Sequence, residues 1–141
     1  MESRMKVKKL DRDFSELVRA LARWACARCG RDLTWDRQRL HSSHHFVRGR
    51  KSVRFDLVNC DALCADCHDE FHRSPAAYRD WMIDRLGEDG YETLTRRANR
   101  IAKFTPGDWT QLEAQLALAL KLVSAFEEIP SVPWKKILLS G

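Results

Sequence analysis

Residues 41–72 read HSSHHFVRGRKSVRFDLVNCDALCADCHDEFH, and this stretch decides the fold that the sequence predicts. It contains all five histidines of the chain, one Cys-x-x-Cys pair and a single asparagine. Outside it, apolar residues recur mostly at the three- and four-residue spacing of helices. We therefore look for chemistry in this stretch and for a helical scaffold around it.

Four cysteines form two pairs with the same two-residue spacing. Cys26 and Cys29 precede Gly30, and Cys64 and Cys67 follow later in the chain. Two such pairs complete a tetrahedral thiolate set, so we expect one structural Zn²⁺ that leaves no position open for water. The alternative is one redox pair plus two buried thiols, which the identical spacing disfavours. The remaining cysteine, Cys60, is expected in the core or partly exposed.

Composition places the chain among soluble globular proteins. The 141 residues are 44% hydrophobic and 32% charged, enough for one domain with a modest core. No apolar run approaches the ~20 residues of a membrane span, and the basic N-terminus lacks the apolar segment of a secretion signal. We therefore expect a cytoplasmic protein without a membrane partner, in a compartment where thiols stay reduced.

Charge is distributed unevenly along the chain. Between Arg19 and Arg54 there are ten basic residues against two acidic ones, a local charge of 10 − 2 = +8. Residues 106–129 carry one basic residue against four acidic ones, or 1 − 4 = −3. This asymmetry favours one surface that faces a polyanion, and the alternative is an ordinary solvated face.

Apolar periodicity and capping signals predict the secondary structure. Residues 1–10 lack a periodic pattern, and we interpret them as a flexible basic arm. Two short strands, at 45–47 and 53–55, are expected around a turn at Gly49. The expected helices run from Asp11 or Asp13 to about residue 25, from the second cysteine pair to about Arg73, and over 75–87, 91–103 and 109–128.

The histidines have spacings that suit a metal site. His68 and His72 are four residues apart on an expected helix, so both imidazoles lie on one face and can share an ion. His44 and His45 are neighbours, and on an extended segment their side chains point to opposite sides. One of them can then bind a metal while the other faces a substrate. Asn59 precedes the helix, where its amide can fix the tautomer of an imidazole.

The order His44-His45, Asn59, His68 and His72, together with the Cys-x-x-Cys pairs, resembles the zinc-bearing branch of the HNH nucleases, which have the ββα-metal (His-Me finger) fold. The resemblance implies an α+β, mostly α protein, with surrounding helices around a ββα-metal core and a four-cysteine zinc knuckle. It implies that His45 is the general base and that Asn59 orients it. It also implies a catalytic divalent ion on His44, His68 and His72. That ion would be Mg²⁺, Mn²⁺, Ni²⁺ or Zn²⁺, and imidazole ligands favour the later metals.

A narrower resemblance rests on the segments HHF, RF followed by Asn59 and Cys60, LCADC, and YRDWMIDRLG. These are similar to the lambdoid-phage recombination endonucleases of the NinG/Rap type, over roughly residues 24–97. The similarity implies branched DNA, such as Holliday junctions and D-loops, in a bacterial or phage-infected cell. His44 and His68 depart from the glycine and asparagine expected there, towards the fuller HNH metal set.

The sequence thus predicts a metal-dependent DNA endonuclease in residues 11–104, followed by a C-terminal helix and tail, 105–141, that pack on it or form a homodimer contact. A neutral imidazole can take a proton from water, and a divalent ion can neutralise charge on the phosphate. Four basic residues should contact backbone phosphates, and Arg54 is also a candidate for a transition-state contact. They are Arg48, Arg50, Lys51 and Arg54. The alternatives are a non-catalytic zinc module that binds nucleic acid and a redox or metal-storage protein.

Overall fold

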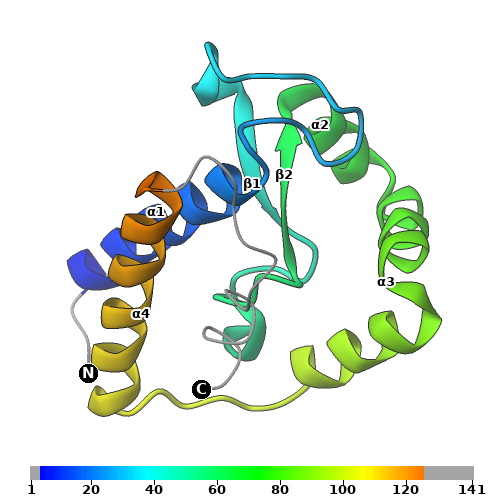
Figure 1. Cartoon of the computed structure of the whole chain (residues 1–141). Helices are drawn as coiled ribbons and strands as arrows, with labels where there is room; N and C mark the ends of the chain where they lie inside the picture. Colours follow the sequence, from blue (N-terminus) through cyan, green and yellow to red (C-terminus); the bar gives the residue numbers. More distant parts are fainter. Residues whose placement is uncertain (1–3, 126–141) are drawn as a thin grey trace.

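The computed structural model describes residues 4–125, in which a two-stranded hairpin lies between helices (Figure 1). In chain order the elements are helix α1 (Arg4–Leu21), the 3-10 turn η1 (Arg37–Arg39), strand β1 (Leu40–His44), the 3-10 turn η2 (Lys51–Val53), strand β2 (Cys60–Cys64), and helices α2 (Ala65–Arg73), α3 (Pro75–Ala98) and α4 (Pro106–Ala125). Over these residues the chain is therefore mostly helical with one small sheet, as predicted. None of these helices is long and apolar enough to cross a membrane.

The hairpin presents two different faces to the helices. β1 and β2 are antiparallel, with Leu40 opposite Cys64 and His44 opposite Cys60. Because side chains alternate along a strand, His41 and Ser43 lie on one face and His44 on the other. The His44 ring lies 6.2 Å from the ring of Phe14 in α1, whereas His41 and Ser43 contact α2 and α3.

The strands lie outside the segments that the sequence predicted. Residues 45–47 and 53–55 form no strand, and both belong to the connection between β1 and β2. Their apolar side chains fill the core from this connection, since Val53 and Phe55 are buried. The β-branched and aromatic residues of these segments favour strands locally. In the folded chain, however, Val53 and Phe55 pack into the core from a connection that is not a strand.

Helix α1 begins earlier than predicted. Residues 4–10 are helical, so the prediction of a flexible arm was wrong for them. The reason is Leu10, which is buried and extends the apolar stripe of Phe14, Leu17 and Val18 by one turn. The helix ends at Leu21 rather than near residue 25, because the next turn contains positive φ angles at Arg23 and Trp24.

The capping signals were read correctly. The Ser74 hydroxyl accepts a hydrogen bond from the Ala77 N–H at the start of α3. Gly87, where a helix end was predicted, adopts the non-helical angles φ 75° and ψ 163°, so α3 consists of two helices that meet at a kink, and the first of them ends there as predicted. The second half of α3 ends at Ala98, earlier than the predicted residue 103.

Helix α4 packs along α1 on the side of the hairpin away from α2 and α3 (Figure 1). It starts with a reciprocal cap, in which Thr105 N–H donates to the Asp108 carboxylate and Asp108 N–H donates to the Thr105 hydroxyl. Leu116 is buried in the core that α4 shares with α1. The predicted end of this helix at 128 and the tail to 141 lie outside the described residues, and a dimer contact stays a prediction.

Candidate functional site

The four paired cysteines meet at one end of the hairpin. One sulfur from each of Cys26, Cys29, Cys64 and Cys67 lies within 4.8 Å of the other three. Among residues 4–125 this is the one such group of metal-ligand atoms. The Cys29 and Cys64 sulfurs are 3.8 Å apart. A tetrahedral Zn²⁺ with bonds of about 2.3 Å requires roughly this separation between sulfurs, so the donor set fits zinc.

Backbone geometry brings the first cysteine pair to the second. Gly30 has φ 77°, which closes a tight turn in which its N–H donates to the Cys26 carbonyl. The Ala27 N–H donates to the Ala62 carbonyl at 2.8 Å and so joins this turn to β2. On the other side, β2 ends at Cys64, whose sulfur accepts from the Cys67 N–H at the first turn of α2.

The charge environment of the thiols differs from one sulfur to the next. Burial opposes ionisation of Cys26, but backbone N–H groups, including that of Cys29, more than offset it and lower its pKa to about 7. Burial and the neighbouring sulfurs raise the pKa of Cys67. The fifth cysteine, Cys60, is fully buried, which raises its pKa well above the usual value. Cys60 therefore belongs to the core and is not a ligand.

Two ion pairs tie the first cysteine turn to α2. Arg28 donates to both carboxylate oxygens of Glu70, at 2.8 and 3.1 Å, and its guanidinium lies 4.4 Å from the centre of the Phe71 ring. Arg31 lies 3.2 Å from the Asp66 carboxylate. These contacts hold α2, and with it His68 and His72, in a fixed position against the cysteine cluster.

Three histidines form a row beside the cysteine cluster. The Nδ1 atoms of His41 and His68 are 2.9 Å apart, and the Nε2 atoms of His68 and His72 are 3.1 Å apart. His41 comes from β1, and the other two from α2. Burial is the main cause that lowers the pKa of His68, with the neighbouring His72 and His41 adding to it. The row is open to solvent at its exposed end, His72.

His44 does not lie with His68 and His72, so the predicted three-histidine ion site is not assembled in this arrangement. Its Nε2 atom is 2.8 Å from the Arg54 carbonyl, on the α1 face of the hairpin. Burial lowers its pKa, against the effect of that carbonyl. The prediction that His44 and His45 point to opposite sides agrees with this geometry, because His45 contacts α3.

His45 sits in an aromatic pocket made by α3. Its Nε2 atom is 2.7 Å from the Tyr91 hydroxyl, and its ring packs edge-on against Tyr78. Its Nδ1 atom is buried and has no hydrogen-bond partner within the part of the chain that the structure describes. Burial, aided by the positive charge of Arg85, lowers the pKa of His45 to about 4. The imidazole is therefore neutral at pH 7.

Asn59 holds the backbone beside His45, and its side chain makes no hydrogen bond to the imidazole. Its amide oxygen accepts from the Phe46 N–H, and its amide nitrogen donates to the carbonyls of Phe46 and Val53. Its own carbonyl accepts from the His45 N–H at 2.9 Å. Asn59 thus fixes the path of the chain after β1, and Tyr91 is the group that orients the ring.

The basic residues predicted to bind phosphate are divided between internal and surface roles. Arg54 makes two hydrogen bonds to the Asp11 carboxylate, at 3.0 and 2.5 Å, and Arg48 lies 3.5 Å from the same group. Arg50 donates to the Asn99 side chain at 2.8 Å. Lys51 is exposed. Arg54 is therefore a structural residue in this arrangement, which differs from its predicted contact with phosphate.

Sequence reasoning missed three residues of this region. His41 and Tyr91 were not among the predicted site residues, and Asp11 was considered only as a possible helix start. One sequence signal could have identified His41. If the strand is placed before His45, residues 41 and 43 lie on the face opposite to His44. Nothing local indicates that Asp11 or Tyr91 would meet this loop.

Together these features define a mostly helical protein in which a small hairpin supports a four-cysteine cluster able to hold a metal ion such as zinc. A model of the family described as bacteriophage lambda NinG protein matches residues 2–126. The chain belongs to this family. No curated protein and no solved structure matches it significantly.

Proposed function

We propose that this protein is a metal-dependent DNA endonuclease that hydrolyses phosphodiester bonds, with His45 as the general base and a role in phage recombination. The observation that carries the proposal is the state of the His45 ring. It is neutral at pH 7, held at Nε2 by Tyr91, and left with an unpartnered Nδ1 atom. A neutral, oriented imidazole with one free nitrogen can accept a proton from water. Because this Nδ1 atom is buried, the residues that cover it must move apart to admit the water.

The tautomer follows from these contacts. For Nδ1 to act as a base, Nε2 must carry the proton and donate it to the Tyr91 hydroxyl oxygen. A phosphate that approaches the ring brings negative charge, which raises the pKa of His45 towards neutrality and strengthens it as a base. Asn59 contributes by holding the backbone of His45 and Phe46 in place.

The ion site of this proposal uses the histidine row in place of the set that the sequence predicted. His68 and His72 would hold the divalent ion through their Nε2 atoms, whose 3.1 Å separation suits two ligands of one metal. The Nδ1–H of His68 would donate to His41, the kind of outer partner that orients a metal-binding imidazole. Two protein ligands leave positions open for water and phosphate oxygens, and the ion would neutralise charge on the reacting phosphate.

The test is cleavage of supercoiled plasmid and of synthetic four-way junctions in the presence of Mg²⁺, Mn²⁺ or Ni²⁺. His45→Ala should lower the cleavage rate by at least about 100-fold, because general base catalysis is typically worth that much. His44→Ala is the matched control, since it removes the neighbouring imidazole on the other face, and it should change the rate only a few-fold.

Two results would count against the proposal. Cleavage by His45→Ala at the wild-type rate would exclude His45 as the base. DNA binding by the wild-type protein without cleavage in any of the three metals would favour the alternative, a zinc-containing nucleic-acid-binding module. Cleavage of junctions without cleavage of linear duplex would support the recombination role.

A further inference from the structure

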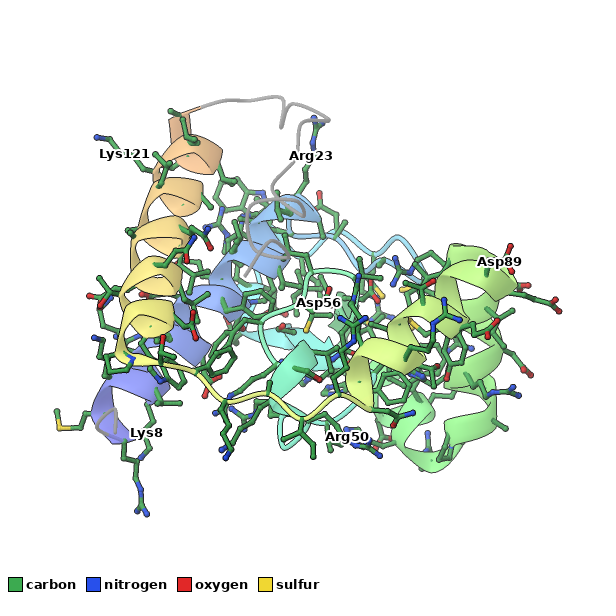
Figure 2. The ribbon with its side chains drawn as sticks, turned by 90° about the horizontal axis from the view of Figure 1, so that it is seen from below. Lys8, Arg23, Arg50, Asp56, Asp89 and Lys121 are labelled. Carbon is green, nitrogen blue, oxygen red and sulfur yellow. The ribbon has the colours of Figure 1, made fainter. Side chains whose placement is uncertain are left out.

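A cavity separate from the histidines lies where the turn η2, the end of α3 and the start of α4 meet. Its volume is about 390 Å³, within the roughly 300–1,000 Å³ of small-molecule sites. Figure 2 looks onto this side of the molecule, where the linker between α3 and α4 crosses below Asp56. The residues that matter here are Lys51, Phe55, Arg100, Lys103, Phe104 and Leu112. None of them has a role in the proposed reaction other than the predicted phosphate contact of Lys51.

The walls of this cavity are fixed by hydrogen bonds from each element. The Ser52 hydroxyl donates to the Arg97 carbonyl at 2.5 Å, and Arg50 donates to Asn99, so η2 is fastened to the end of α3. On the opposite wall, the reciprocal cap of Thr105 and Asp108 fixes the start of α4. The cavity is therefore already formed without a ligand, which lowers the entropic cost of binding.

Part of the cavity lining is apolar and aromatic. Phe55 and Phe104 both line it, with their ring centres 6.5 Å apart. Behind them, the Trp109 ring packs edge-on against Phe104 at 4.8 Å. Leu112 of α4 continues this surface. A planar ring can stack on or pack against such a surface, as bases do on aromatic side chains.

Another part of the lining is cationic. The two acidic residues that line the cavity are already engaged, since Asp56 lies 2.7 Å from Arg97 and Asp108 caps α4. Lys51, Arg100 and Lys103 are exposed and have no acidic partner within residues 4–125. Three uncompensated cations beside an apolar wall suit a ligand that has one anionic end and one flat, weakly polar end.

The amides of Gln111 and Gln115 complete the lining. Each offers a donor and an acceptor, the combination that pairs with the edge of a nucleobase. We propose that this cavity binds one unpaired nucleotide of DNA, with the base against Phe104 and Leu112 and its phosphate at Arg100 and Lys103. The inference rests on the proposed function only in taking DNA as the polymer that supplies the nucleotide.

The experiment is a titration of the full zinc-loaded chain, without added divalent ion, followed by calorimetry and amide chemical shifts. The probes are the four deoxynucleoside 5′-monophosphates, with inorganic phosphate and deoxyadenosine as partial ligands. At least one monophosphate should bind about tenfold more tightly than either partial ligand, since both ends of the site are used. Inorganic phosphate that binds as tightly as every monophosphate would overturn the assignment of the base, and no binding would overturn the proposal.

Paired variants test the location. Arg100→Glu with Lys103→Glu should weaken monophosphate binding by at least about tenfold. Arg12→Glu with Lys121→Glu makes the same change in charge at exposed positions outside the lining, and it should leave binding within about twofold. Equal losses in both pairs would show a general charge effect and overturn the site. Gln111→Trp fills the cavity while keeping its cations, and unchanged binding in that variant would also overturn it.

This titration separates the inference from the proposed nuclease activity. A wild-type protein that binds the monophosphate but cleaves no DNA would overturn the proposed function and support the cavity. A protein that cleaves DNA but binds no monophosphate would overturn the cavity alone.

Discussion

The cysteine cluster and the histidine row share α2 but differ in geometry. The four sulfurs approach one another closely enough to surround one ion completely. The three imidazoles instead contact in sequence, His41 to His68 and His68 to His72, so that at most two of them can face one ion with the atoms in contact. A complete donor set excludes water, whereas an incomplete set leaves room for it.

The difference extends to the surroundings of each cluster. Cys26, Cys64 and Cys67 are buried, and ion pairs from Arg28 and Arg31 to α2 lock the cluster between elements far apart in sequence. The histidine row ends at the exposed His72. We therefore expect the thiolates to stabilise the fold and, under the proposed function, the imidazoles to take part in the reaction. The following experiments test that assignment.

The largest effect is expected for Cys64→Ser. This change removes one thiolate of the closed set, and structural zinc contributes much of the folding free energy of small domains, so we expect a loss of roughly 5 kcal/mol or more. Zinc content by atomic emission and thermal melting measure it. Cys60→Ala is the control, because it removes a buried thiol outside the cluster and should keep one zinc per chain. A Cys64→Ser protein with wild-type zinc content and melting temperature would refute the cluster.

A second, smaller effect is expected for the residue that holds the chain beside His45. Asn59→Ala removes three side-chain hydrogen bonds in a fully buried place and leaves the N–H and the carbonyl of Phe46 unpaired, whereas the Val53 carbonyl keeps its bond from the Asp56 N–H. We expect a loss of about 3 kcal/mol in the free energy of unfolding by urea, with zinc retained. Loss of zinc in this variant would show that the loop and the cysteine cluster are one cooperative unit.

A third prediction concerns pH. The pKa of His45 is lowered to about 4 in the folded chain, below the value near 6.5 of an unfolded histidine. The unfolded state therefore binds the proton first as pH falls, and stability that is present above pH 6.5 is lost between about pH 6.5 and 4. Because His45 is only half-buried, we expect a loss of about 1 kcal/mol from pH 7 to pH 5. Urea unfolding at both pH values measures it, and His45→Gln should lack this part of the decline.

Local sequence signals correctly predicted the features of the structure that depend on residues close together in sequence. The two Cys-x-x-Cys pairs predicted the cluster, because two-residue spacing and Gly30 already determine how each turn presents its sulfurs. The hydroxyl caps at Ser74 and Thr105 were equally local. Helix α1 was predicted too short because Leu10 is one apolar residue among lysines, and its burial depends on packing in the folded chain.

The predictions that were wrong concern features that depend on contacts between residues far apart in sequence. Residues 40–44, LHSSH, have little strand preference and form β1 because β2, buried along its whole length, pairs with them. Because the strand is at 40–44, His41 contacts His68, and His44 lies on the other face of the hairpin. Arg54 was assigned to phosphate because it lay in the predicted strand 53–55, facing the histidine pair, but residues 53–55 form no strand and its partner Asp11 lies in α1. Such pairings become visible only in the folded chain.

The smallest effect on stability separates the two possible histidine sets. His72 is exposed, so His72→Ala should change the free energy of unfolding by less than about 0.5 kcal/mol. Excess Ni²⁺ should raise the melting temperature of the wild type by binding the folded state, and His72→Ala should abolish that rise. His41→Ala should weaken Ni²⁺ binding by about tenfold through the loss of the outer partner of His68, whereas His44→Ala should leave it unchanged. The reverse pattern, in which His44→Ala abolishes the rise and His41→Ala does not, would restore the ligand set predicted from the sequence and require the hairpin to present His44 to α2.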